Sequence, residues 1–281
     1  MARKRLTITI KDELLDLLDN TIDGSKIRNR SHAFEYLLTK YLIPEATRVL
    51  VLTGGNGIKL RPITYEIPKC LIPIHDKPLV EYTFENLKKS NLTDITLSTG
   101  RLGDKIEKQF GDGSLYNLDI KYKKVDKKNP GTSYPVYQTK NDFSDKPFVL
   151  IYGDVLADID YLDLIEYHKS HRGIATIALA SVEKPSEWGV VDMKGNRIVR
   201  FTEKPNKKVK SHLINAGIYV LDPSVFKYIK KDHKMLEKDL FPRLAQEGKL
   251  YGYPFEGQWF DVGTPEIYEE VLKKWKGFKN K

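Results

Sequence analysis

The sequence predicts an α/β fold with a mixed, mostly parallel sheet, preceded by a small N-terminal domain. Runs of β-branched residues and leucine, such as Val49 to Leu52 and Phe148 to Tyr152, have the composition of buried strands. Segments with helical periodicity, such as Pro78 to Ser90, separate these runs. The alternation is typical of a sheet covered by helices on both faces, where ligands gather at the carboxyl ends of the strands.

The composition narrows the class of protein further. Of 281 residues, 40% are hydrophobic and 30% are charged, as in an ordinary soluble globular protein. Because no apolar stretch is long enough to span a membrane and the N-terminus does not have the pattern of a signal peptide, we expect a cytoplasmic protein with no membrane partner. The single cysteine, Cys70, excludes an intramolecular disulfide. The net charge of +9 suits an anionic partner, either nucleic acid or phosphorylated small molecules.

The sequence divides into an expected first domain, residues 1–44, and a second, residues 45–281. In the first, Arg5 to Ile10 alternates polar and apolar residues, which predicts a short strand. Leu14 to Ile22 has helical spacing and is followed by Gly24, a common C-terminal cap. A second helix is expected to begin at Ser31 as N-cap and to end before Pro44.

A strand and two helices in this order resemble the ribbon-helix-helix fold of DNA-binding proteins, in which two chains pair their strands. The resemblance implies a homodimer or higher homo-oligomer, with double-stranded DNA as a partner. The residues that it implies at the DNA are Arg5, Thr7, Thr9, Arg30 and Ser31. The alternative is a module that only dimerises, with a strand face that is merely solvated.

A glycine-rich loop, Gly54 to Gly57, directly follows the strand Val49 to Leu52. Glycines let backbone amides approach phosphate oxygens closely, and Lys59 and Lys69 bring cations nearby. The loop therefore predicts an anion site. The alternative at this point is a tight strand-to-helix turn with solvated charges.

The same stretch resembles the opening signature of the sugar-1-phosphate nucleotidylyltransferases, which include mannose-1-phosphate guanylyltransferases and glucose-1-phosphate thymidylyltransferases. It reads Gly54-Gly55-Asn56-Gly57-Ile58-Lys59-Leu60-Arg61-Pro62-Ile63-Thr64, with Pro68-Lys69 after it. The resemblance implies a Rossmann-like nucleotidyltransferase domain, nucleotide binding by Gly54, Gly55 and Gly57, and catalytic roles for Lys59 and Lys69. Ile58 and Lys59 depart from the family's Thr and Arg; a lysine keeps the charge but loses the bidentate geometry of arginine.

Two acidic residues resemble the metal ligands of the same family. Asp154 follows the strand Phe148 to Tyr152, and Asp261 lies in Trp259-Phe260-Asp261-Val262-Gly263-Thr264, which matches the family's Trp-x-Asp-x-Gly-Thr. The resemblance implies that Asp154 and Asp261 bind Mg²⁺, which prefers oxygen ligands. An aspartate after a strand, considered alone, is more often a turn or cap residue than a metal ligand.

Further segments match the family's substrate-binding motifs. They imply that Gly189, Glu203 and Asn215 line a sugar pocket and that Lys204 contacts the sugar phosphate, although Glu203 and Lys204 alone are also consistent with a surface ion pair. Gly131 and Thr132 match the loop that contacts the nucleotide base. Tyr134 replaces a glycine of that loop, so the sequence leaves the base open.

The resemblance implies a Mg²⁺-dependent reaction in which an NTP and a sugar 1-phosphate give an NDP-sugar and pyrophosphate. Catalysis of this kind depends on positioning and charge rather than on covalent steps. The competing hypothesis is a ribbon-helix-helix transcription regulator that uses its second domain as a sensor of nucleotide or sugar nucleotide.

Overall fold

The computed structural model describes residues 7–22, 27–42, 47–125, 131–207 and 209–278. The chain divides into two compact units, Met1–Ala46 and Thr47–Lys281, which are described separately here. The expected boundary after residue 44 lies close to this division.

The first unit contains two helices, α1 (Asp12–Asp19) and α2 (Arg30–Leu42). They pack through the buried side chains of Leu18, Ile27 and Ala33. Both expected helices are present, whereas Arg5, Gly24 and Pro44 lie outside the described residues. The expected strand is not formed in the single chain over its described part, residues 7–10. A ribbon that forms between two chains is not tested by one chain.

The start of α2 differs from the expectation that Ser31 caps it. The helix begins at Arg30, and the cap is Asn29, whose side-chain Oδ1 accepts a hydrogen bond from the backbone N–H of His32 at 2.9 Å. Asn and Ser are similarly good N-caps, so sequence preference alone does not decide between neighbouring candidates. Asn29 is the N-cap because it directly precedes the helix, and its side chain reaches the free N–H group of His32.

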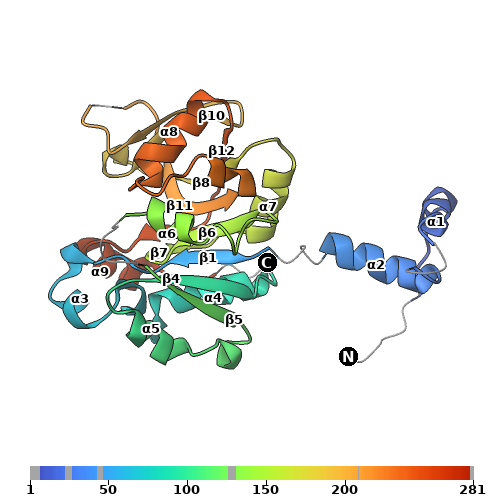
Figure 1. The fold of residues 1–281 in the computed structure, drawn as a ribbon, viewed down its shortest axis with the longest axis horizontal. Coiled ribbons are helices and arrows are strands. Elements are labelled where there is room, and N and C mark those ends of the chain that lie inside the picture. The colour runs from blue at the N-terminus through green and yellow to red at the C-terminus, as the bar shows by residue number, and fades with distance from the viewer. Residues whose placement is uncertain (1–6, 23–26, 43–46, 126–130, 208, 279–281) are drawn as a thin grey trace. The chain divides into compact units, whose positions relative to one another are not determined.

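The second unit is organised on a nine-stranded sheet with the order β5-β4-β1-β6-β11-β8-β12-β10-β9. These strands span β1 (Val49–Leu52), β4 (Asp94–Thr99), β5 (Asp119–Lys124), β6 (Phe148–Tyr152), β8 (Ala175–Ser181), β9 (Gly189–Lys194), β10 (Arg197–Glu203), β11 (Leu213–Leu221) and β12 (Leu250–Pro254). The helices include α3 (Ile63–Glu66), α4 (Leu79–Lys89), α5 (Gly103–Phe110), α6 (Ser133–Gln138), α7 (Tyr161–Lys169), α8 (Phe241–Gln246) and α9 (Pro265–Lys274). Figure 1 shows α4 and α5 beside β4 and β5, and α8 beside β10 and β12.

The sheet is mixed and mostly parallel, as expected: seven of its nine strands run in one direction, and β10 and β11 run in the other. The four neighbouring strands β5, β4, β1 and β6 run parallel. Beyond β6 the pairings of β11 with β6 and β8, and of β10 with β12 and β9, are antiparallel, while β12 and β8 are parallel. The direction of β10 follows from the tight hairpin at Gly195, whose φ is +60°, because such a turn joins β9 and β10 as antiparallel strands.

The apolar residues of the sheet alternate between two cores. Val49 and Val51 of β1 face one cluster, which contains α4, α5 and α7 side chains, and Leu50 faces the other, which contains α8 side chains. A strand points successive side chains to opposite faces, so a run that is apolar throughout is buried on both sides. Both cores therefore hold the carboxyl ends of β1, β4 and β6 at one edge of the sheet, where the candidate site lies.

A second, two-stranded sheet pairs β7 (Val155–Ala157) with β13 (Trp259–Asp261). Asp261 pairs with Val155, and the N–H of Val262 donates to the carbonyl of Asp154 at 2.9 Å. This pairing brings two acidic residues from distant parts of the chain together.

Candidate active site

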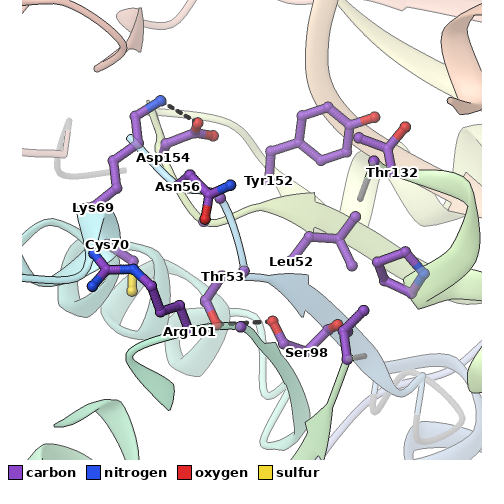
Figure 2. Close-up of a pocket in the computed structure, with 17 residues that line it drawn as sticks. Leu52, Thr53, Asn56, Lys69, Cys70, Ser98, Arg101, Thr132, Tyr152 and Asp154 are labelled. Carbon is purple, nitrogen blue, oxygen red and sulfur yellow. Dashed lines mark hydrogen bonds and ion pairs between the residues drawn. The ribbon is translucent and has the colours of Figure 1, made fainter. Parts of the chain in front are cut away.

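The glycine-rich loop after β1 borders a cavity of about 470 Å³. Gly54, Gly55 and Asn56 line it, together with Gly131 and Thr132 from a separate loop. Asn56 and Thr132 are labelled in Figure 2. The position of Gly54 depends on a close approach to the loop after β4, since a Cβ on Gly100 would lie 2.7 Å from the carbonyl oxygen of Gly54. The cavity therefore brings together four of the five residues expected to bind nucleotide.

Gly57 and Lys59 have other surroundings. Gly57 has a φ of +57°, and a Cβ there would lie 2.7 Å from Thr64 Cγ2, so this position favours glycine for its backbone and its close packing. Lys59 lies in a single turn of 3-10 helix, Ile58–Leu60, and is exposed. Neither residue is among the described residues that line the cavity.

Lys69 lies between the two acidic residues expected to bind metal. Its Nζ donates a hydrogen bond to Asp154 Oδ2, as Figure 2 shows, and lies 3.9 Å from Asp261 Oδ1. Asp261 Oδ2 in turn accepts a hydrogen bond from the indole N–H of Trp188 at 3.2 Å. One ammonium and two carboxylates thus face one another at the edge of the cavity.

The charges of this group affect one another strongly. Burial acts to lower the pKa of Lys69, but the carboxylates of Asp154 and Asp261 outweigh it, and the pKa is raised. Burial, followed by the charge of Asp154, raises the pKa of Asp261. Two carboxylates held this close favour a cation between them, and here that cation is the Lys69 ammonium.

The donor set fits a divalent cation that is shared with a substrate. Asp154 and Asp261 supply hard oxygen ligands, as Mg²⁺ requires. Among the described residues, no cluster of three or more His, Cys, Asp or Glu side chains could hold a metal ion. A cation at Asp154 and Asp261 would therefore take its remaining ligands from substrate oxygens and water, which is the usual coordination of Mg²⁺ in nucleotide sites.

A smaller cavity, of about 190 Å³, lies on the other side of Asp154. All four residues expected at the sugar phosphate, Gly189, Glu203, Lys204 and Asn215, line it, and so does Asp261. Tyr152 and Asp154 line both cavities. The two cavities are therefore adjacent at the acidic pair.

Local structure explains the shape of this smaller cavity. A Cβ on Gly189 would lie 2.5 Å from Phe201 Cζ and 3.0 Å from Glu203 Oε2, so only glycine leaves this space to the Glu203 carboxylate. Burial, followed by the charge of Glu237, raises the pKa of Glu203. Lys204 has a φ of +43°, which is unfavourable for a residue with a Cβ and recurs at ligand sites. Its ammonium acts to lower the pKa of Asp261, after the larger effects of that residue's other neighbours.

Sequence reasoning missed several residues that line the cavities. Arg101 donates to the carbonyls of Thr64 and Tyr65 at 2.8 and 3.2 Å, which ties the glycine-loop segment to the loop after β4. Ser98 is 1% exposed, and its hydroxyl has no hydrogen-bond partner among the described residues. Ser98 lies near the carboxyl end of β4, and Arg101 follows this strand. The rule that ligands gather at the carboxyl ends of parallel strands could therefore have predicted both residues. Glu237 gave no such signal, because it lies on a helical segment far along the chain.

The residues expected to contact DNA differ in their surroundings. Thr7, Thr9 and Ser31 are exposed. Arg30 makes a bidentate ion pair with Asp19 of α1, with nitrogen-to-oxygen distances of 2.7 and 2.6 Å. Its charge is thus already partnered within the unit.

No helix in the described ranges has both the length and the apolar character needed to cross a bilayer.

Comparisons with known proteins agree with this geometry. Residues 48–276 match the family model described as nucleotidyl transferase. The chain is 34% identical over 226 residues to a mannose-1-phosphate guanyltransferase beta-A of Xenopus laevis and 36% identical over 225 residues to a mannose-1-phosphate guanyltransferase of Hypocrea jecorina. These matches cover 79% and 78% of this chain but only 62% and 61% of the relatives, so the chain spans less than two thirds of their length.

Solved structures show the same fold. A structure described as a glucose-1-phosphate thymidylyltransferase from Bacillus anthracis superimposes with a TM-score of 0.75 at 26% identity, covering 84% of this chain and 98% of that one. HddC from Yersinia pseudotuberculosis in complex with GMP-PN superimposes with a TM-score of 0.70 at 23% identity, covering 82% of this chain and all of the other, which compares the fold alone. The resemblance inferred from the motifs is thus confirmed, and the chain belongs to the nucleotidyl transferase family.

Proposed function

We propose that this protein transfers a nucleotidyl group from an NTP to a sugar 1-phosphate, releasing pyrophosphate. The observation that carries the proposal is the meeting of two cavities at Asp154, with Lys69 and Asp261 beside it. GTP and mannose 1-phosphate are the first pair to test, because the guanyltransferases of Xenopus laevis and Hypocrea jecorina are similar over most of this chain.

The larger cavity takes the NTP, and the smaller one takes the sugar 1-phosphate. The backbone amides of Gly54 and Gly55 hold phosphate oxygens, Gly57 fixes the turn that follows, and Lys59 meets the departing pyrophosphate. The Glu203 carboxylate accepts hydrogen bonds from sugar hydroxyls, the Asn215 amide accepts and donates them, and Lys204 holds the sugar phosphate. A phosphate oxygen of the sugar then attacks the α-phosphorus, and the bond to pyrophosphate breaks.

Lys69 acts where charge gathers during this displacement. Its ammonium faces the junction of the cavities, so it can follow the negative charge that develops around the α-phosphate. Asp154 and Asp261 would hold Mg²⁺, which when bound neutralises charge on the phosphate oxygens. Positioning and electrostatics thus account for the chemistry without a protein nucleophile.

The first unit is proposed to pair two copies of the chain. Ile8, Leu14, Leu17 and Leu38 are between 40% and 63% exposed, although apolar side chains of this size usually cluster away from water. Pairing of strands at residues 5–10 would cover such side chains. We further propose that the first unit binds double-stranded DNA through Arg5, Thr7, Thr9, Arg30 and Ser31. A gel-shift assay with random duplex DNA at low and high salt tests this proposal.

The experiment for the main proposal is a matrix of four NTPs and several sugar 1-phosphates with Mg²⁺, read as pyrophosphate release. We expect turnover with one pair, lost in Asp154→Asn and retained in Asp192→Asn, a matched carboxylate that pairs with Arg200 on the surface. No release from any pair, by a protein that binds a nucleotide, would instead favour the regulator that senses nucleotides.

A further inference from the structure

One short segment, Lys234 to Glu237, lines the smaller cavity and contacts a loop that borders the larger one. Met235 and Glu237 line the smaller one. The same segment holds the loop that borders the larger one, because the N–H of Ser133 donates to the carbonyl of Lys234 at 3.1 Å. The walls of the two cavities are thus joined by one piece of backbone.

The loop lies directly against this segment. A Cβ on Gly131 would be 2.0 Å from the carbonyl oxygen of Lys234, and the φ of Gly131 is +124°. The N–H of Leu236 also donates to Thr132 Oγ1 at 2.9 Å. Any displacement of the loop therefore displaces the segment, and the reverse is also true.

Glu237 connects these contacts to the sheet. It is 6% exposed, and its carboxylate accepts hydrogen bonds from Thr132 Oγ1 at 2.7 Å and from the hydroxyl of Tyr152 at 2.5 Å. Tyr152 ends β6 and lines both cavities. A buried carboxylate is costly unless it is fully hydrogen-bonded, so this network resists rearrangement. Glu237 also lies in a π-helix, Leu236–Leu240, a conformation that is common at functional sites.

These bonds engage the Thr132 hydroxyl on both sides. It donates to Glu237 and accepts from the N–H of Leu236, so its one hydrogen is not free for a nucleotide. The hydroxyl of Thr132 therefore positions the loop, and it cannot donate to a nucleotide while it is bonded to Glu237.

We propose that Thr132, Glu237 and Tyr152 couple the two substrates, so that a sugar 1-phosphate in the smaller cavity tightens nucleotide binding in the larger one. Glu237 links the two binding sites. It lines the smaller cavity together with Glu203, and it accepts a hydrogen bond from Thr132, which lines the larger cavity. Coupling of this kind is reciprocal: each substrate raises the affinity for the other by the same factor. The inference rests on the proposed function.

The test is calorimetric titration of a GTP analogue that has a methylene group between its α- and β-phosphates, with Mg²⁺ and with or without saturating mannose 1-phosphate. Pyrophosphate cannot leave from this analogue, so no turnover occurs. For the wild type we expect affinity for the analogue to rise about fivefold or more when the sugar phosphate is present. Thr132→Val, which keeps the shape but loses the hydroxyl, should lower that factor to below twofold. Thr132→Ser should restore the coupling.

The controls separate this role from a general loss of structure. Thr139→Val removes a buried hydroxyl that donates to the Val136 carbonyl of α6, the helix that Thr139 caps, and should leave the coupling unchanged. If Thr132→Val does not fold, Glu237→Gln carries the test, with an expected loss of at least threefold in the coupling factor. A wild-type factor near one, or full coupling in Thr132→Val or Glu237→Gln, would overturn the inference while leaving the transferase activity standing. A wild type that binds neither ligand would overturn both.

Discussion

Lys69 is an ammonium held by two carboxylates at the point where two cavities meet. Its charge balances Asp154 and Asp261, which lie at the ends of separate strands. The raised pKa means that Lys69 stays charged across the physiological range. A fixed positive charge in a partly dry site acts more strongly on a developing negative charge than it would in water.

Replacement of Lys69 by methionine keeps the aliphatic stem and removes the charge. We expect kcat to fall by a factor of 10² to 10³, which corresponds to about 3 to 4 kcal/mol of transition-state stabilisation. The measurement is steady-state turnover under saturating substrates. Lys77→Met is the matched control and should leave kcat unchanged. Lys77 also forms an ion pair, with Glu85 at 2.6 Å, but it is not among the described residues that line either cavity.

At the residue scale the sequence predicted most of the site, because the family motifs are local. Asp154, Asp261, Lys69 and the sugar-side residues come together as the motifs imply. The roles of single residues are less local. Lys59 is exposed. The sequence motif did not predict this, because the direction of the side chain depends on the geometry of a turn that the motif does not specify. Glu237 was missed because its partners Thr132 and Tyr152 lie 105 and 85 residues away in the sequence.

At the scale of elements, a buried chain of hydrogen bonds joins α7 to β8. Gly173 N–H donates to His171 Nδ1 at 3.0 Å, so His171 carries its proton on Nε2 and donates to Thr176 Oγ1 at 3.0 Å. The Thr176 hydroxyl then donates to His168 Nδ1 at 2.8 Å. Burial, followed by His171, lowers the pKa of His168 to about 4, and burial lowers that of His171 to about 4.

These pKa values predict how stability changes with pH. Because the unfolded state binds protons near pH 6.5 and the folded state resists them until about pH 4, the stabilisation is complete above pH 6.5 and is lost as the pH falls. Between pH 7 and pH 5 we expect the wild type to lose about 2 kcal/mol of unfolding free energy through His168, with a smaller loss through the less buried His171. Urea unfolding at the two pH values measures it.

The matched variants are His168→Gln with His171→Gln, and His212→Gln. The double variant should show a clearly smaller drop between the two pH values than the wild type does. His212 is exposed, and its replacement should leave the drop unchanged. An equal drop in the double variant would rule out this histidine pair as the source.

The sequence predicted the elements of the second unit well where hydrophobic periodicity is strong. The strands expected at 49–52 and 148–152 are found with those bounds, and the helix expected at 78–90 is α4, Leu79–Lys89. The apolar pattern alone does not reveal which strands are reversed, because a fully buried strand is apolar whether its neighbour is parallel or antiparallel. The reversal of β11 therefore has no signal in the sequence, whereas the β9–β10 turn does.

At the scale of the whole molecule, the exposed leucines of the first unit have a predicted consequence for assembly. Leu14 and Leu17 of α1 are 51% and 63% exposed. If they cover a second copy of the chain, Leu14→Glu with Leu17→Glu should convert a dimer into a monomer, because burying a charge without a partner is strongly unfavourable. Light scattering coupled to size-exclusion chromatography gives the mass directly.

Leu115 provides the matched control for this prediction. It is 91% exposed and belongs to the second unit, so Leu115→Glu should leave the mass unchanged. A wild type that is monomeric at micromolar concentration, or a double variant that stays dimeric, would contradict the proposed pairing through α1.

The most direct test of the whole account follows the α-phosphate itself. The protein is incubated with Mg²⁺, mannose 1-phosphate and GTP labelled at the α-phosphorus, and the products are separated. The account predicts label in a sugar nucleotide that forms in step with pyrophosphate, and neither product in Asp154→Asn or Asp261→Asn. Label found only in free GMP, or no labelled sugar nucleotide from any NTP and sugar 1-phosphate pair, would contradict it.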